Sequence, residues 1–413
     1  MKSFFSFFKY LFIILFILII LFINFKLLFT PGQNNLEKIF ESAHKQLNFL
    51  EPQVHEKHLA EQMQYIYPEG YVFANVLYGL SWTEISKKPD PDSILFLHAQ
   101  KEANYALARL QSDSAKTIFD KQQQPEYGIF YRGWVNYLLG KMIQAHIVKD
   151  TISINLFKQN CAEIAAAFSN ATTPYPDSYV NMSWPADACV AMASLQLYNK
   201  LYTPLYDTLI QNWIENVKVH LDTATGLIPH QSASGTGNTL EGARGSSMSL
   251  ILIFLAEIDP VFAQQQFVIY QKQFQHTILG LPAIREYPAG TSGTGDIDSG
   301  PVVFGMSFTG TIVGIGTFAK FGATNQSRKL SACIEAFGFP VSFNNKKQFA
   351  LGKFPIADMF IVWSRLQAPE PGLNDANNDY NFGTTLWLHL SSLIILAIMV
   401  YRFWRKKLKQ QRS

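Results

Sequence analysis

Charged residues are scarce in this chain. Lys, Arg, Asp and Glu make up 16% of its 413 residues, whereas roughly 25% is usual in soluble proteins. The formal net charge is only +3, and a basic C-terminal tail supplies much of the positive charge. The composition therefore gives no basis for nucleic-acid binding.

Cysteine is also rare. Cys161, Cys189 and Cys333 are far apart, odd in number and without CxxC spacing, so they are expected to be small core residues. A single disulfide bridge in an oxidising compartment remains open as the alternative. The sequence predicts no metal site and no cofactor.

Alternation of apolar and polar residues, the mark of strands, is almost missing between the two ends of the chain. Apolar residues instead recur at three- and four-residue spacing in helix-length runs that Pro and Gly separate. The predicted helices cover 36–64, 70–86, 92–111, 128–147, 151–169, 185–200, 203–221, 244–257, 260–277, 302–320, 324–338 and 355–367.

The predicted helices alternate between an apolar kind and an amphipathic kind. A helix that is apolar all round is buried, and one with a polar face lies outside. The apolar helices begin roughly 57 residues apart, a period typical of repeated helical hairpins. The sequence thus predicts an all-α domain, a closed (α/α)6 toroid of twelve helices, with an open helical solenoid as the alternative.

The connections between helices also fall into two kinds. Those from an amphipathic helix to the next apolar helix are long and rich in unusual residues. In a toroid all six would lie at one end, over the N-termini of the inner helices, where pockets form and anions are favoured. These loops are 65–70, 122–133, 172–184, 222–244, 280–301 and 341–355.

On this repeat of helical hairpins, residues 36–367 resemble the six-hairpin toroid superfamily. That superfamily includes glycoside hydrolases, polysaccharide lyases, uronyl epimerases and linalool dehydratase-isomerase-like proteins. The resemblance rests on architecture and not on a diagnostic motif, so it implies a fold more than a reaction.

Both ends of the chain are apolar. Residues 1–30 contain an uncharged run from Tyr10 to Phe25, long enough with its neighbours to span a membrane, although a cleaved signal peptide is the alternative. Residues 384–401 form a second predicted span, or else a buried terminal helix. The basic tail 402–413 follows it and indicates a cytoplasmic C-terminus.

The predicted organisation is therefore an anchor, a toroid domain over 31–368, a linker over 369–383, the second span and the tail. Both termini would lie in the cytoplasm of a plasma or inner membrane. The toroid would lie outside the cytoplasm, in the periplasm if the cell is Gram-negative.

The most polar loop is Arg285 to Pro301, REYPAGTSGTGDIDSGP. It has no Lys-Ser/Thr after its glycines, so it is not a phosphate-binding P-loop. Ser307 stands where a calcium-binding EF-hand needs a Glu, so that motif also fails. A general acid or base role for Asp296 or Asp298 remains, and Asp298 or Ser299 could instead cap a helix that begins at Pro301.

Two further acids occur at loop ends. Asp187 opens the helix of the SWPAD segment and either complements the helix dipole or faces the pocket. Glu241 precedes Arg244, a cation at a helix N-terminus, which requires a compensating partner. The predicted catalytic residues are Asp187, Asp298, Asp296 and Glu241, and the predicted substrate-binding residues are Tyr131, Arg132, Trp134, Trp184, Arg244, Arg285 and Tyr287.

Acids, arginines and aromatics at one end of a ring suit a carbohydrate or uronate ligand, or another small molecule. A glycosidase would use Asp187 and Asp298 as acid and base. A lyase or epimerase would use Tyr131 with Arg132 and Arg244. The alternatives are a non-catalytic membrane-tethered scaffold or glycan-binding protein, and an enzyme acting on an apolar substrate.

Overall fold

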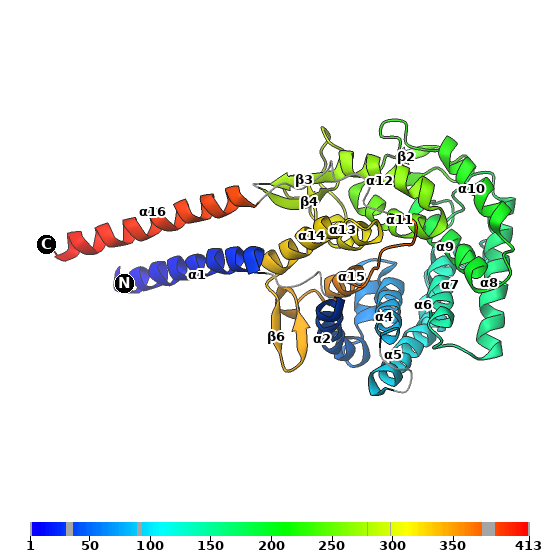
Figure 1. The fold of residues 1–413 in the computed structure, drawn as a ribbon, viewed down its shortest axis with the longest axis horizontal. Coiled ribbons are helices and arrows are strands. Elements are labelled where there is room, and N and C mark those ends of the chain that lie inside the picture. Colours follow the sequence, from blue (N-terminus) through cyan, green and yellow to red (C-terminus); the bar gives the residue numbers. More distant parts are fainter. Residues whose placement is uncertain are drawn as a thin grey trace.

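The structure, a computed structural model, describes residues 2–29, 36–88, 93–278, 280–297, 299–373 and 385–411. Within them the chain forms sixteen α-helices and seven short strands. Figure 1 shows a round helical body from which the first and last helices project together.

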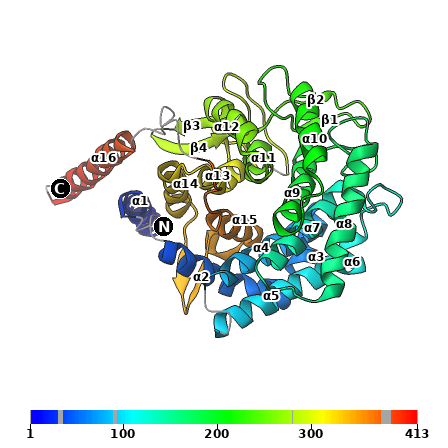
Figure 2. The same ribbon diagram turned by 45° about the vertical axis from the view of Figure 1, so that its right-hand side comes forward.

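Six helices form an inner ring (Figure 2). Each packs on the next in the sequence, and the last packs back on the first, so the ring is closed. This closure confirms the predicted toroid and excludes an open solenoid. The inner helices are α4 (Gly70–Ser86), α7 (Gly128–Gln144), α9 (Pro185–Leu201), α11 (Gly245–Ile258), α13 (Phe308–Lys320) and α15 (Pro355–Arg365).

The outer helices turn an apolar face to the inner ring and a polar face to solvent, as amphipathic sequences do. Side chains of Ser93, Asp150 and Asp259 cap three of them by accepting a hydrogen bond from a first-turn amide. The outer helices are α2 (Leu36–His55) with α3 (Leu59–Ile66), α5 (Ile94–Gln111) with the short α6 (Asp113–Lys116), α8 (Thr151–Asn170), α10 (Asp207–Val219), α12 (Pro260–Phe274) and α14 (Thr324–Phe337).

Aromatic side chains fill the inside of the ring. Trp134 of α7 packs edge-on against Phe254 of α11, with 5.2 Å between ring centroids, and Phe254 stacks on Trp363 of α15 at 6.3 Å. Each pair skips one inner helix, so these contacts cross the interior of the ring. All three residues are buried, and Trp134 is therefore a core residue and does not line an open pocket.

The prediction of an all-α domain needs one amendment, because three loops contain short antiparallel strands. In the fifth loop, β5 pairs with the end of β4, and residues 302–307 are consequently not helical. The predicted helix 302–320 begins only at Phe308, and Ser307 caps it, not Asp298 or Ser299. The strands are β1 (Gln231–Ser232), β2 (Thr239–Glu241), β3 (Gln275–Ile278), β4 (Leu281–Arg285), β5 (Met306–Ser307), β6 (Val341–Phe343) and β7 (Lys346–Gln348), and the 3-10 helix η1 (Ala350–Gly352) follows β7.

The three cysteines are buried and form no disulfide with one another, as expected of small core residues.

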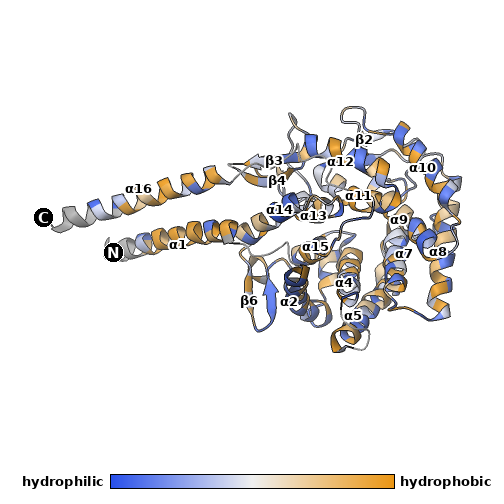
Figure 3. Ribbon diagram, viewed as in Figure 1, coloured by the Kyte–Doolittle hydropathy of each residue, from blue (hydrophilic) through white to orange (hydrophobic). Residues whose placement is uncertain are grey.

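The terminal helices α1 (Lys2–Phe29) and α16 (Leu386–Gln411) lie side by side. Apolar residues run along α1 (Figure 3), and its segment Phe8–Leu28 is long and apolar enough to cross a membrane, a property that signal sequences share. In α16 the apolar part, Leu386–Arg402, is shorter, so among the described residues only α1 has the length of a span. The second span and the orientation of the termini stay predictions.

Truncation of Phe254 to Ala is expected to lower the free energy of unfolding by about 3–5 kcal/mol, since it leaves a cavity in the middle of the ring. Chemical denaturation of the full chain in detergent, followed by circular dichroism, measures this. Val219→Ala, at an exposed position at the end of α10, is the control and should change stability by about 0.5 kcal/mol or less. A similar small effect of Phe254→Ala would show that the aromatic interior does not stabilise the ring.

Candidate active site

The loops before the inner helices contact one another, as the toroid predicts. Tyr179 in the third loop donates a hydrogen bond to Glu69 in the first, at 2.5 Å. The hydroxyls of Ser183 and Ser232 join the third loop to the fourth at 3.0 Å. The fourth and fifth loops meet at Arg244, which is where charged side chains converge.

The fourth and fifth loops meet at Arg244 because the backbone at Gly245 lies very close to the backbone at Arg285. A Cβ added to Gly245 would lie 1.7 Å from the carbonyl oxygen of Arg285, so only glycine fits there. The Gly245 amide also donates to the carbonyl of Glu286 at 2.8 Å. The start of α11 is thus fixed against the end of β4, which places the Glu286 side chain beside Arg244.

Arg244 is buried, with 2% of its side chain exposed, and acidic groups surround it. Its Nε donates to the fully buried Glu286 at 2.6 Å, and its Nη1 contacts Glu241 at 3.3 Å and also bonds Asp296. The guanidinium lies 5.6 Å from the centre of the Tyr287 ring, within cation–π range. The carboxylates stabilise the positive charge of Arg244 and so compensate for its unfavourable interaction with the dipole of α11.

Asp296 is held in its ionised form. Partial burial alone would raise its pKa, but the hydrogen bond from Arg244 and the Ser299 amide, which donates at 3.0 Å, hold that pKa well below its usual range. An acid with so low a pKa carries no proton near neutral pH. Asp296 can therefore accept hydrogen bonds or act as a base, but it cannot act as a general acid.

His230 completes this group. Its Nδ1 bonds the hydroxyl of Ser247, and its Nε2 lies 3.4 Å from Arg244 Nη1 and 3.8 Å from Glu241. Burial, together with the Arg244 charge, lowers the pKa of His230 to about 4. The imidazole is therefore neutral at neutral pH. We call Arg244 and its neighbours the Arg244 centre; it comprises His230, Glu241, Arg244, Glu286, Tyr287 and Asp296.

Two buried atoms of the Arg244 centre have no hydrogen-bond partner. They are Arg244 Nη2 and Glu286 Oε2. Buried polar atoms are nearly always paired, because leaving one unpaired costs about 1–3 kcal/mol. Such unpaired atoms recur at sites that bind water or a ligand.

A small cavity of about 90 Å³ adjoins the centre. Ligand pockets usually measure about 300–1,000 Å³, so this cavity is too small for a sugar ring. A larger ligand would lie across the exposed carboxylates of Glu241 and Asp296, which are 41% and 42% exposed. The cavity is lined by Arg285, Tyr287, Thr291, Ser292, Gly293, Val302 and Gly305.

Of the residues proposed from the sequence, the structure brings five to this region: Glu241, Arg244, Arg285, Tyr287 and Asp296. Asp298 lies outside the described residues. His230 and Glu286 were not among the residues proposed from the sequence. Their positions in the sequence could have indicated them: His230 lies in the loop that ends at Arg244, and Glu286 lies between Arg285 and Tyr287.

Three other proposed residues lie apart from the Arg244 centre. The Tyr131 hydroxyl donates to the carbonyl of Leu110 at 2.7 Å, and burial raises its pKa. Arg132 donates to Asn160 at 2.8 Å and pairs with two glutamates, one of them on the outer helix α8. Trp134 belongs to the aromatic interior.

The other two proposed residues, Trp184 and Asp187, lie at the start of α9. Asp187 accepts a hydrogen bond from the Ser178 hydroxyl at 2.6 Å, and Ser178 in turn accepts one from the Trp184 amide. The Trp184 ring packs edge-on against Tyr179 at 5.5 Å. These contacts hold the third loop to the start of α9.

No family model and no curated protein matches this sequence. Solved structures similar to the chain include a D-mannose isomerase, with 9% identity and a TM-score of 0.44 over 70% of this chain and 86% of that one. A GH76 alpha-mannanase from Bacteroides thetaiotaomicron matches with 11% identity and a TM-score of 0.42, over 72% and 86% of the two chains. Dfg5 from Chaetomium thermophilum, solved in complex with glucosamine, matches with 10% identity and a TM-score of 0.49, over 85% and 97%.

All three are members of the (α/α)6 toroid superfamily that the helical repeat resembles. With such identities and with TM-scores below 0.5, the likenesses carry no argument about activity. The packing of α15 on α4 within this chain closes the ring.

His230 is expected to contribute a loss of stability as the pH drops from about 6.5 to about 4. His230 has a pKa of about 4 when folded and about 6.5 when unfolded, so in this window the unfolded chain binds the proton more readily. The loss from this residue is at most about 3 kcal/mol at the acid end. From about one pH unit above 6.5 both states are neutral and His230 contributes no slope.

His230→Asn should remove this contribution, so that between pH 6.5 and 4 the unfolding free energy of the variant shifts by up to about 3 kcal/mol in the variant's favour relative to the wild type. Denaturation at a series of pH values measures this. His58→Asn, at an exposed position, should keep the wild-type slope. Equal slopes in wild type and His230→Asn would show that His230 does not carry this pH dependence.

Proposed function

We propose that this chain is a membrane-anchored protein that binds a glycan at the loop end of its ring, through the Arg244 centre. The observation that carries the proposal is the convergence of two half-exposed carboxylates and an aromatic ring on one buried arginine. Sugar hydroxyls need fixed acceptors and donors, and sugar rings pack on aromatic faces.

Rigid acceptors suit this task because little side-chain entropy is lost when the ligand binds. Arg244 contacts the Glu241 and Asp296 side chains. Glu286 in turn fixes Arg244 by accepting a buried hydrogen bond of 2.6 Å from its Nε. Glu286 also accepts from the Ser246 hydroxyl at 2.7 Å. Both outer carboxylates are partly exposed to solvent.

If the protein hydrolyses a glycoside, the roles within this centre are constrained. A hydrolase needs one protonated acid and one carboxylate that activates water or attacks the sugar. Asp296 is ionised and fits the second role but not the first. A lyase or epimerase built on Tyr131 and Arg132 is less well supported, because both side chains are engaged elsewhere.

Membrane anchoring is supported by how α1 meets the ring. Phe22 of α1 stacks on Phe339 with 5.7 Å between centroids, and Lys26 lies 3.8 Å from Glu335. Large apolar side chains in the following loop are exposed, including Phe343, Leu351 and Phe354. Apolar groups exposed next to an apolar helix are suited to the surface of a bilayer.

The double variant Glu241→Gln/Asp296→Asn is expected to lose at least about tenfold in glycan affinity while keeping its helical circular dichroism, since each lost charged hydrogen bond is worth about 1.5–3 kcal/mol. A glycan array, followed by calorimetry on the full chain in detergent, measures this. Glu215→Gln, an exposed carboxylate on α10, is the matched control. Absence of binding by the wild type, or unchanged binding by the double variant, would contradict the proposal.

The full-length protein should remain in the membrane pellet after extraction with alkaline carbonate, because Phe8–Leu28 would span the bilayer. N-terminal sequencing of the extracted protein separates an anchor from a cleaved signal. A mature chain that begins after residue 30 and is released by carbonate would refute anchoring by α1.

A further inference from the structure

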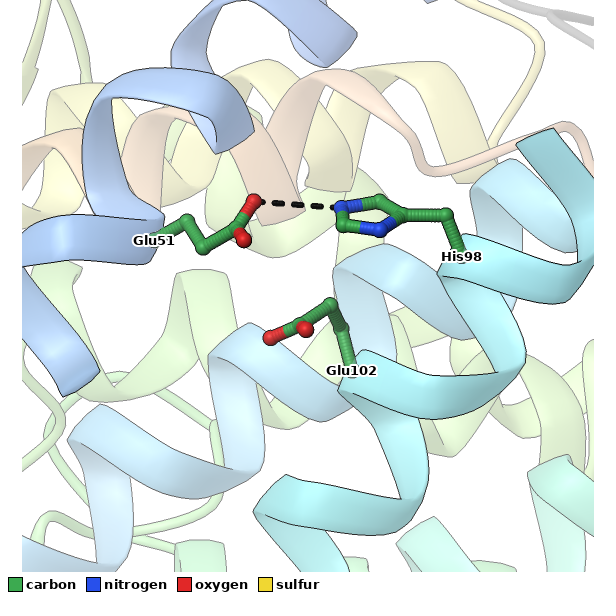
Figure 4. A group of neighbouring side chains, drawn as sticks. All are labelled: Glu51, His98 and Glu102. Atoms are coloured by element: carbon green, nitrogen blue, oxygen red, sulfur yellow. Dashed lines mark hydrogen bonds and ion pairs between the residues drawn. The ribbon is translucent and has the colours of Figure 1, made fainter. Parts of the chain in front are cut away.

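The outer wall of the ring carries a second group of potential ligands, away from the loops that form the Arg244 centre. Glu51 lies on α2, and His98 and Glu102 lie on α5. One ligand atom from each lies within 4.8 Å of the others. Figure 4 shows the three side chains converging from the two helices on one space.

We propose that Glu51, His98 and Glu102 bind a divalent transition-metal ion, with zinc the best fit to this mixed nitrogen and oxygen set. His98 Nε2 lies 3.1 Å from Glu51 Oε2. Two ligands on a tetrahedral ion, each about 2.0–2.2 Å from it, are roughly 3.4 Å apart, so this pair already has nearly the required spacing.

Glu102 supplies the observation that points to a missing ligand. Its side chain is fully buried, and its Oε1 has no hydrogen-bond partner. Lys101 Nζ lies 3.6 Å from that oxygen, beyond hydrogen-bonding distance. A buried carboxylate oxygen without a donor is costly, and a bound cation would remove that cost.

The other oxygen of Glu102 is fixed by two neighbours. Oε2 lies 2.6 Å from His55 Nε2 and accepts from the Tyr78 hydroxyl at 2.8 Å. The His98 ring packs edge-on against Trp82 with 5.0 Å between centroids. Groups of this kind behind the ligands orient them and raise metal affinity.

The spacing along each helix also suits a shared site. Glu51 and His55 are four residues apart on α2, and His98 and Glu102 are four apart on α5. Residues at this spacing lie on one face of a helix. Each helix therefore presents one carboxylate and one imidazole to the other.

A cavity of about 470 Å³ opens beside the cluster. Glu51 and His55 line it from α2, Lys101 from α5, and Asn344 and Asn345 from the turn between β6 and β7. Of the three ligands Glu51 lines it, so an ion would reach the site from the side of Glu51, where a water molecule could take a fourth position, as in zinc sites that keep an open position.

The competing explanation is that the four groups form only two ion pairs, Glu51 with His98 and His55 with Glu102. That explanation predicts that mutation changes stability to the same extent with and without metal. A metal site predicts that zinc stabilises the wild type and that loss of a ligand removes the effect.

The full chain in detergent, stripped with EDTA and dialysed, is titrated with zinc by calorimetry and with cobalt by visible absorption. The expected result is one equivalent of zinc per chain, the d–d bands of tetrahedral cobalt, and a rise in melting temperature with zinc. His98→Ala and Glu51→Gln should each weaken zinc binding at least about tenfold, and Tyr78→Phe, which only positions Glu102, by about 10-fold or more.

His58→Asn replaces an exposed histidine outside the cluster and should bind zinc as the wild type does. Glu51 is partly exposed, and glutamine has nearly the same shape as glutamate. Glu51→Gln therefore tests the site even if His98→Ala fails to fold. Failure of the wild type to bind one equivalent of zinc would overturn the proposal. Equal zinc affinity in wild type and Glu51→Gln would also overturn it, whatever the result for glycan binding.

Discussion

The closed ring depends on a charged network buried between the inner helices. Glu257, near the C-terminus of α11, accepts from Lys320 of α13 at 2.7 Å and from the Tyr137 hydroxyl of α7 at 2.9 Å, and it lies 3.6 Å from Lys141 of α7. Burial alone would raise the pKa of Glu257, but the two lysines hold it well below its usual range. Breaking one member of such a network costs about 3–5 kcal/mol, because the remaining charge stays buried.

This network also joins the end of the domain to its middle. Lys320 reaches Glu370, beyond α15, at 3.3 Å, and the Glu370 amide donates to the Lys320 carbonyl. Lys141 and Lys320 lie in the last turns of their helices, where the helix dipole favours a cation. One carboxylate and two lysines from separate helices thus join α7, α11 and α13 in a single arrangement.

Aromatic packing inside the ring decides where function can lie. Phe254 contacts residues of α7 and α15 across the interior, so the middle is a core. The candidate polar sites therefore lie at the loop end and on the outer wall of the ring. The Arg244 centre uses the loop end, where Gly245 allows β4 to approach α11, and the cluster of Glu51, His98 and Glu102 uses the wall.

The ring could be predicted from the sequence, because burial imposes an apolar pattern on every inner helix and the hairpins repeat it at a nearly constant period. The same pattern predicted that the loops around Arg244 and Asp296 lie at the polar end. The charged partners could not be predicted: Glu286 contacts Arg244 from another loop, and Glu51 contacts His98 across 47 residues. Local sequence patterns record which residues are buried, whereas the pairing of charges depends on how helices and loops distant in the chain are brought together.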